Sequence, residues 1–360
     1  MDLFSELEQT LDQPAVAIDL LIERLAEEHR WDEWFQARLM RTRLELGSLP
    51  DHVQIEAARE AGKHYIEDGE ILRAWPYFRA LGERQPVIDA IQNLDPEQFT
   101  EEILSLSFQE RLNPKKALEL LLASNGICRA ITVFEQYPDP PTWEEALGML
   151  TRALHDELAG NLQQAIARQE GATPTSGDIR ALVSGRAWLF GEYDSYVDAS
   201  HLFGILRLAI ESACPETLSL ALAMAEYGCC LSGTFRPSTQ PPFDDYCRDH
   251  VIYLKALLGQ DVDGAIDHFR KKDFSAEVLV RLLLRVGRSS EAVEVFEQHL
   301  LDRDPAFLSC PDLAQLCQQA GDFDRLQKLS RQRNDPVGFL QAALSRRALN
   351  LQPGCGAHHD

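Results

Sequence analysis

Residues 51–86 read DHVQIEAAREAGKHYIEDGEILRAWPYFRALGERQP. Apolar and small residues recur there at helical spacing in two runs, which are separated by the turn Asp68-Gly69-Glu70. The first run is Ile55, Ala58, Gly62, Tyr65 and Ile66, and the second is Leu72, Trp75, Phe78 and Leu81. Gly69 stands where the end of a helix favours a left-handed residue. The stretch therefore predicts two antiparallel helices joined by a tight turn.

Six residues of this pair stand at the spacings of a known repeat signature: Gly62, Tyr65, Gly69, Ala74, Phe78 and Pro86. In these residues the pair resembles a tetratricopeptide repeat. In such a repeat the small residues let the two helices approach closely, and the aromatic residues fill the space between them. One unit cannot bury both of its faces, so the resemblance implies stacked neighbouring units.

The same resemblance is good at residues 276–305, partial at 113–141, 249–271 and 311–330, and lost at 171–247. The fold class that it implies is an all-α, right-handed superhelix of antiparallel helix pairs with an irregular central segment. Other segments also have helical periodicity, including a first pair at 15–46 and a last helix that begins after Asp335 and ends near Leu351.

Two local signals locate breaks between helices. In 113–141 we expect Asn125 to take the place of the turn glycine, because asparagine tolerates the left-handed conformation. Residues 142–158 and 160–169 are predicted as two helices, and the Gly- and Pro-containing stretch 170–177 is the best candidate for a linker. The predicted division is a repeat half at 1–170, a central segment at 171–248, a second repeat half at 249–351 and a disordered tail at 352–360.

The chain carries 57 acidic and 35 basic side chains, a formal charge of −22 over 360 residues. This balance argues against nucleic acid or an anionic membrane as a partner and favours a protein with a basic surface.

The sequence contains neither a secretory signal nor a long uninterrupted apolar run, so we expect a cytoplasmic protein without a membrane segment. Eight cysteines without a Cys-x-x-Cys pair are expected to be buried thiols rather than metal ligands.

The central segment contains the residues that helix pairing does not explain. Trp188, Tyr193, Tyr196 and Phe243 are aromatic residues in stretches rich in glycine, proline and acidic residues, and Arg236 stands between an aromatic residue and a proline. We predict that these five residues bind a partner, because aromatic and arginine side chains are common in interfaces. The alternative is that they pack as a plug between the two halves of the chain.

The main alternative to a binding protein is an enzyme, namely a metal-dependent hydrolase that uses His155, Asp198, His201 and His250. Its weakness is that no HExxH or comparable spacing is present, and Asp198 is also placed to cap a helix. The sequence shows no nucleophile elbow and no glycine-rich phosphate loop. We therefore expect no catalytic residues, no cofactor and no metal. The predicted function is a non-enzymatic scaffold for protein or peptide binding, and a purely structural subunit is a further alternative.

Overall fold

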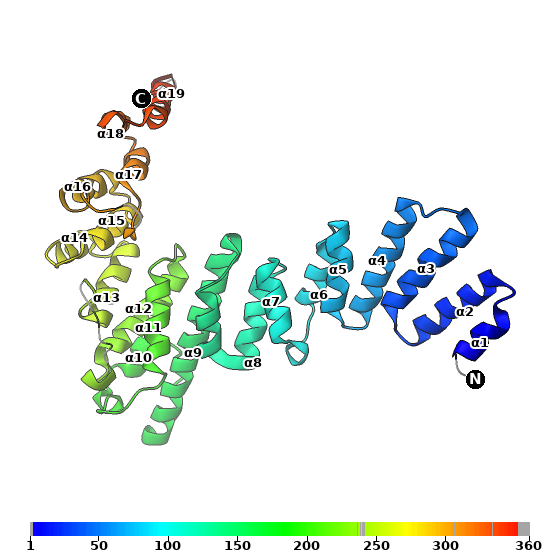
Figure 1. Cartoon of the computed structure of the whole chain (residues 1–360). Helices are drawn as coiled ribbons and strands as arrows, with labels where there is room; N and C mark the ends of the chain where they lie inside the picture. Colours follow the sequence, from blue (N-terminus) through cyan, green and yellow to red (C-terminus); the bar gives the residue numbers. More distant parts are fainter. Residues whose placement is uncertain are drawn as a thin grey trace, which may run out of the picture. The chain divides into compact units, whose positions relative to one another are not determined.

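The computed structural model describes residues 3–235, 237, 239, 242–304, 307–332 and 334–351. Within these residues the protein is all-α, with nineteen α-helices, a few short 3-10 turns and no β-strand (Figure 1). Consecutive helices pack against one another as neighbouring pairs. The helices form two compact units, Met1–Leu150 and Thr151–Asp360.

The helices of the first unit are α1 (Leu3–Thr10), α2 (Pro14–Glu27), α3 (Trp31–Leu46), α4 (Asp51–Glu67), α5 (Ile71–Leu81), α6 (Gln85–Gln92), α7 (Glu101–Gln109), α8 (Pro114–Phe134) and the beginning of α9 (Trp143–Glu170). Those of the second unit are the rest of α9 and α10 (Ile179–Val183), α11 (Ala199–Ala209), α12 (Pro215–Cys230), α13 (Tyr246–Leu257), α14 (Val262–Arg270), α15 (Ala276–Arg285), α16 (Ser289–His299), α17 (Leu313–Ala320), α18 (Phe323–Gln332) and α19 (Pro336–Leu351).

The pair α4–α5 confirms the prediction for residues 51–86. Gly69 has φ +79° and ends the first helix, as expected. At Gly62 an added Cβ would lie 2.8 Å from Cε2 of Phe78, so the small residue is what allows α5 to approach α4. Two predicted positions are wrong, however: Ile55 and Leu72 are exposed. Ala57 and Ile71 are buried near these two positions instead, whereas the predicted Tyr65, Trp75 and Phe78 are buried. The predicted stripe is therefore correct over most of each helix and wrong only near its start.

Two predicted breaks also differ from the structure. In α8 the non-helical residue is Gly126, with φ 77° and ψ 179°, and not Asn125. This region of backbone conformation is accessible almost only to glycine, so a true glycine takes the position in preference to its asparagine neighbour. The two helices predicted at 142–158 and 160–169 are one helix, α9, that continues through Gly160. A single helical glycine costs only about 1 kcal/mol, too little to end a long helix.

Among the described helices, α8 alone has the length and hydropathy that could span a membrane, with 44% of the relevant window buried. The sequence was expected to hold no such segment. Because Leu118 and Leu121 of α8 are fully buried, a core helix explains the same composition.

The predicted linker and central segment lie within the second unit. Gly171 has φ +76° just after the end of α9, and no regular helix follows until α10. The predicted boundary at residue 170 therefore falls after α9, inside the unit Thr151–Asp360. The predicted tail at 352–360 lies outside the described residues.

Candidate functional site

An apolar groove of about 590 Å³ lies in the first unit, among α1, α2 and α3. We call it the N-terminal groove. Its apolar lining is Leu3, Phe4 and Leu7 from α1, Leu21 and Leu25 from α2, Phe35, Ala37 and Met40 from α3, and Tyr77 from α5. Its polar lining is Arg30, Asp32, Glu33 and Gln36. This volume and this mixture of many apolar side chains with a few polar groups are typical of a binding pocket.

Several lining residues are large apolar side chains in contact with water. Phe4 of α1 is 78% exposed and Met40 of α3 is 51% exposed. Single exposed apolar residues are ordinary on a protein surface. Here they line one concavity whose deeper residues, such as Leu25, are buried, and such a concentrated apolar patch marks an interaction site.

One wall of the groove is held by hydrogen bonds around Asp32. The hydroxyl of Tyr77 donates to Asp32 Oδ1 at 2.7 Å, and Arg73 Nη2 donates to Asp32 Oδ2 at 2.9 Å. Arg73 Nη2 also donates to the hydroxyl of Tyr65 at 2.7 Å. Burial acts to raise the pKa of Asp32, but the hydrogen bonds from Tyr77, Arg73 and Tyr65 outweigh it and hold the pKa below its ordinary value. Asp32 is therefore a stable anion that joins α3 to α5.

The start of α3 is fixed to α4 by a second set of contacts. Its N-cap residue makes no side-chain cap, so the amide of Asp32 needs another acceptor, and it donates to the hydroxyl of the fully buried Tyr65 at 3.0 Å. Beside it, the Trp31 ring stacks on His64 at a centroid distance of 4.0 Å, and Trp31 Nε1 donates to Asp68. These contacts leave α3 little freedom, so its groove-lining side chains are presented from a rigid support.

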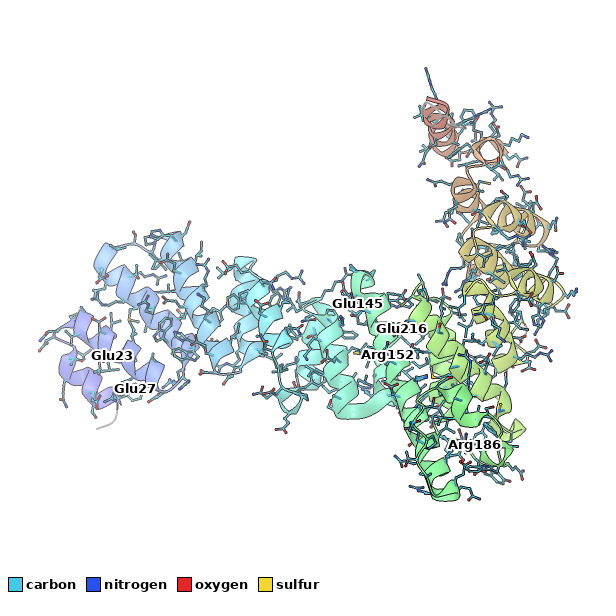
Figure 2. All side chains as sticks on the ribbon, turned by 180° about the vertical axis from the view of Figure 1, so that it is seen from behind. Glu23, Glu27, Glu145, Arg152, Arg186 and Glu216 are labelled. Carbon is cyan, nitrogen blue, oxygen red and sulfur yellow. The ribbon has the colours of Figure 1, made fainter. Side chains whose placement is uncertain are left out.

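The groove lies in the most acidic part of the chain. Residues 1–33 contain ten acidic and two basic side chains. Both bases are already engaged, since Arg24 pairs with Glu6 and Glu27, and Arg30 pairs with two further glutamates. Figure 2 labels Glu23 and Glu27 on α2 in this region. The surroundings of the groove are therefore negative, and they attract positively charged groups.

The structure places the five predicted partner-binding residues in different settings. Trp188 and Tyr193 are exposed, the latter by 75%. Tyr196 is half-buried, and its backbone amide donates to the hydroxyl of Tyr227 at 2.9 Å. Phe243 packs 4.7 Å from His250 and 5.6 Å from Phe269, between ring centroids. Arg236 lies outside the described residues.

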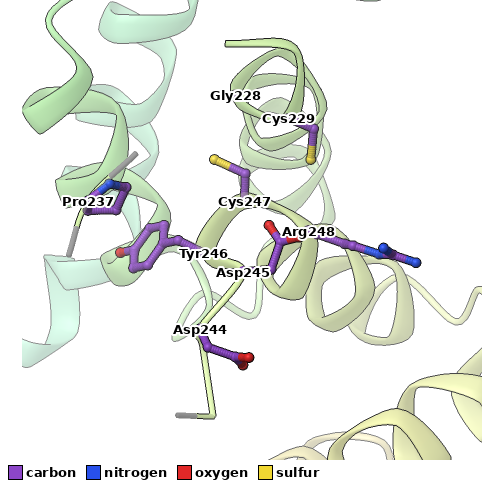
Figure 3. A pocket seen from close by; sticks show the side chains of 8 residues that line it. All are labelled: Gly228, Cys229, Pro237, Asp244, Asp245, Tyr246, Cys247 and Arg248. Carbon is purple, nitrogen blue, oxygen red and sulfur yellow. The ribbon is translucent and has the colours of Figure 1, made fainter. Parts of the chain in front are cut away.

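Near Phe243, a smaller pocket of about 290 Å³ lies between the end of α12 and the start of α13 (Figure 3). An added Cβ at Gly228 would lie 2.6 Å from Sγ of Cys247, so this glycine allows the two helices to meet. The adjacent loop is anchored by Lys272, whose Nζ pairs with Asp244 and with the buried Asp249. His268 Nε2 lies 2.8 Å from the other oxygen of Asp249. The carboxylates of Asp244 and Asp249 are therefore paired within the protein, and these pairs join the start of α13 to α14 and to Lys272 just beyond it.

The four residues of the alternative metal site have separate local roles. Asp198 caps α11, where it accepts from the amide of Ser200 at 2.7 Å. His155 Nδ1 lies 3.1 Å from its neighbour Asp156, and His250 is buried on α13. His201 is half-buried in the first turn of α11. Within the residues that the structure describes, no three His, Cys, Asp or Glu side chains form a group that could hold a metal ion.

Comparison of the chain with protein-family models, curated proteins and solved structures gives no match. The case for the N-terminal groove therefore rests on its geometry. Sequence reasoning missed this site, because it considered the first residues only as an acidic segment without a signal sequence. The available signal was the trio Leu3, Phe4 and Leu7, which share one face of a short helix by their spacing.

Proposed function

We propose that this protein is an interaction scaffold whose N-terminal groove binds a helical segment of a partner protein. The observation that carries the proposal is that the exposed Phe4 of α1 and Met40 of α3 both line one apolar groove of about 590 Å³. An amphipathic helix that docks in a groove inserts apolar side chains at positions i, i+3, i+4 and i+7. The side chains of α1, α2 and α3 offer the apolar contacts that such a helix needs.

The charge around the groove defines the partner further. Ten acidic side chains in the first 33 residues, with both bases paired, favour a segment that carries lysine or arginine beside its apolar stripe. Glu33 and Asp32 stand at the groove itself, where they pair with Arg30 and Arg73, so the negative field comes from the surplus of acidic side chains around them. We therefore propose a basic amphipathic helix as the ligand.

We also propose that the helix pairs wind as a tetratricopeptide-like, right-handed superhelix. Support comes from residues that match the signature in a second pair, α15–α16. Gly287 there has φ +79°, Ala292 is fully buried and Phe296 is nearly so, as at the matching positions of α4–α5. A solenoid of this kind offers long binding surfaces, which suits a scaffold. The cytoplasmic location and the absence of nucleic-acid and membrane partners stay predictions.

Fluorescence anisotropy with a labelled synthetic probe tests the binding function. The probe is a short amphipathic helical peptide with leucines on one face and arginines beside them. We expect the double variant Phe4→Asp/Met40→Asp to weaken its binding by about tenfold or more, because removal of a central apolar anchor typically costs over 1 kcal/mol. Both side chains are largely exposed, so the fold is expected to tolerate the change.

Ile55→Asp is the matched control, since Ile55 is also an exposed apolar residue of the first unit but does not line the groove. It should leave the affinity unchanged. The same peptide with glutamates in place of arginines should bind more weakly than the basic one. Equal affinity of the wild type and the double variant for the basic peptide would overturn the proposal.

A further inference from the structure

The helix α19 carries a second exposed apolar surface, in the second unit. Val337, Leu340 and Leu344 follow one another at the spacing i, i+3 and i+7, so they form one stripe. Val337 is 75% exposed and Leu344 is 58% exposed. Ala342 is buried, as expected for the face that packs on α18. The stripe of α19 thus has the pattern of an amphipathic helix without a partner for its apolar face.

The charge of this region is opposite to that of the whole chain. Residues 325–347 contain six basic side chains and one acidic side chain, within a protein of charge −22. Arg347 is exposed and continues the stripe at i+3 from Leu344. Arg346 pairs with Asp324, whereas Arg347 has no ion-pair partner among the described residues. The helix therefore presents apolar side chains with a free cation beside them.

We propose that the occupant of the N-terminal groove is α19 of a second copy of this chain. This inference rests on the proposed function of the groove and names its partner. The groove provides an apolar, concave surface in a segment with ten acidic and two basic side chains, and α19 provides a convex apolar stripe with Arg347 beside it. The groove is concave and the stripe is convex, both surfaces are apolar, and the charges around them are of opposite sign.

The two surfaces are different and belong to the same chain, so the contact is heterologous. Each copy offers one groove and one α19, and each contact leaves one groove and one α19 unoccupied. Copies joined in this way form chains that lengthen with concentration, or rings if the rotation between copies closes. Because opposite charges help to form the contact, added salt should shorten the assemblies.

Sedimentation velocity of the full-length chain tests this inference with two variants. The groove variant is Phe4→Asp/Met40→Asp, which keeps α19 intact. The helix variant is Leu340→Asp/Leu344→Asp, which keeps the groove intact. We expect the wild type to form species larger than a dimer as its concentration rises, and each variant alone to sediment as a monomer. A mixture of the two variants in equal amounts should form dimers and nothing larger, because only one functional contact is left per pair.

The distinguishing result is a dimer in the mixture when each variant alone is a monomer, because in a symmetric contact between identical faces the variant that keeps that face would dimerise by itself. Phe274→Asp, which replaces an exposed apolar residue away from both surfaces, should assemble like the wild type. Circular dichroism of each variant checks that its helices are retained. A wild type that stays monomeric, or a mixture without dimers, overturns the inference. If the synthetic peptide still binds in that case, the proposed function stands and only the identity of the partner is wrong.

Discussion

His250 shows how a single side chain in the second unit depends on its surroundings. It is buried on α13, where its Nδ1 lies 2.8 Å from the carbonyl oxygen of Tyr246 and the ring of Phe243 covers it. Its Nε2 is buried without a hydrogen-bond partner among the described residues. Burial lowers the pKa of His250 from its ordinary value to about 4, against smaller opposing effects of Tyr246 and Asp249. The folded protein therefore keeps this imidazole neutral.

This lowered pKa predicts a loss of stability in mild acid. Below pH 6.5 the unfolded chain binds a proton at His250, whereas the folded chain does so only near pH 4. The contribution of this residue is thus fully present above pH 6.5 and is lost as the pH falls towards 4. At pH 5 the loss of stability relative to neutral pH amounts to about 2 kcal/mol.

Urea unfolding at pH 7 and pH 5 measures this effect. We expect the midpoint of the wild type to fall more between the two pH values than that of His250→Leu, whatever the absolute stability of the variant. An equal fall of the urea midpoint in both proteins would show that His250 is already protonated in the folded chain at pH 5, and that burial does not lower its pKa.

Individual residues were predictable from the sequence where the backbone itself constrains the choice. Gly69 was found because the end of a helix needs a left-handed residue there. Ile55 and Leu72 were placed wrongly because the sequence offers apolar residues on more than one face of each helix, and only the packing partner decides which face is buried. Periodicity alone does not decide which of these residues is buried near the start of a helix.

At the scale of elements, the pairing of helices depends on small residues at close contacts. The contact of Gly62 with the ring of Phe78 is such a position, and Phe78 is fully buried, so its ring has little room to move. Gly160 is also inside a helix, α9, but an added Cβ there would meet nothing within 4 Å. Gly62 is therefore required by the close contact between α4 and α5, whereas no close contact requires a glycine at position 160.

The same substitution at these two sites should have opposite effects. Gly62→Ala should destabilise the protein by about 1–3 kcal/mol, because the methyl group overpacks the contact with Phe78. Gly160→Ala should stabilise α9 by about 0.5–1 kcal/mol, because alanine loses less conformational freedom in a helix. Thermal unfolding followed by circular dichroism measures both, and a lower melting temperature is expected only for Gly62→Ala. An unchanged or higher melting temperature for this variant would mean that α4 and α5 are not packed at Gly62.

The order of the helices was largely predictable, because their periodicity is strong, but two of the predicted breaks were wrong. Asn125 and Gly126 are adjacent and both tolerate unusual backbone angles, and the structure uses the second. The sequence suggested two helices at 142–158 and 160–169, although the structure has the single helix α9 there. In α8 the local preference of glycine decides the position of the break, whereas in α9 the preference of one glycine is too weak to end a long helix.

At the scale of the whole molecule, charge is distributed unevenly along the chain. Residues 1–150 carry 29 acidic and 14 basic side chains, and residues 151–360 carry 28 and 21. The excess of acid is thus 15 in the first part and 7 in the second, and it is greatest near the N-terminal groove. The sequence predicted a basic partner from the total charge, but only the fold shows that Phe4, Leu21 and Met40, far apart in the sequence, line one groove.

The most direct test of the groove is methyl NMR of the protein labelled at methionine. The chain has four methionines, of which Met40 lines the groove and the buried Met224 belongs to the other unit. Titration with the basic amphipathic peptide should shift the methyl signal of Met40 and leave that of Met224 in place, and Phe4→Asp should reduce the response. A peptide that binds while the Met40 signal stays unchanged would contradict the assignment of the N-terminal groove as the binding site.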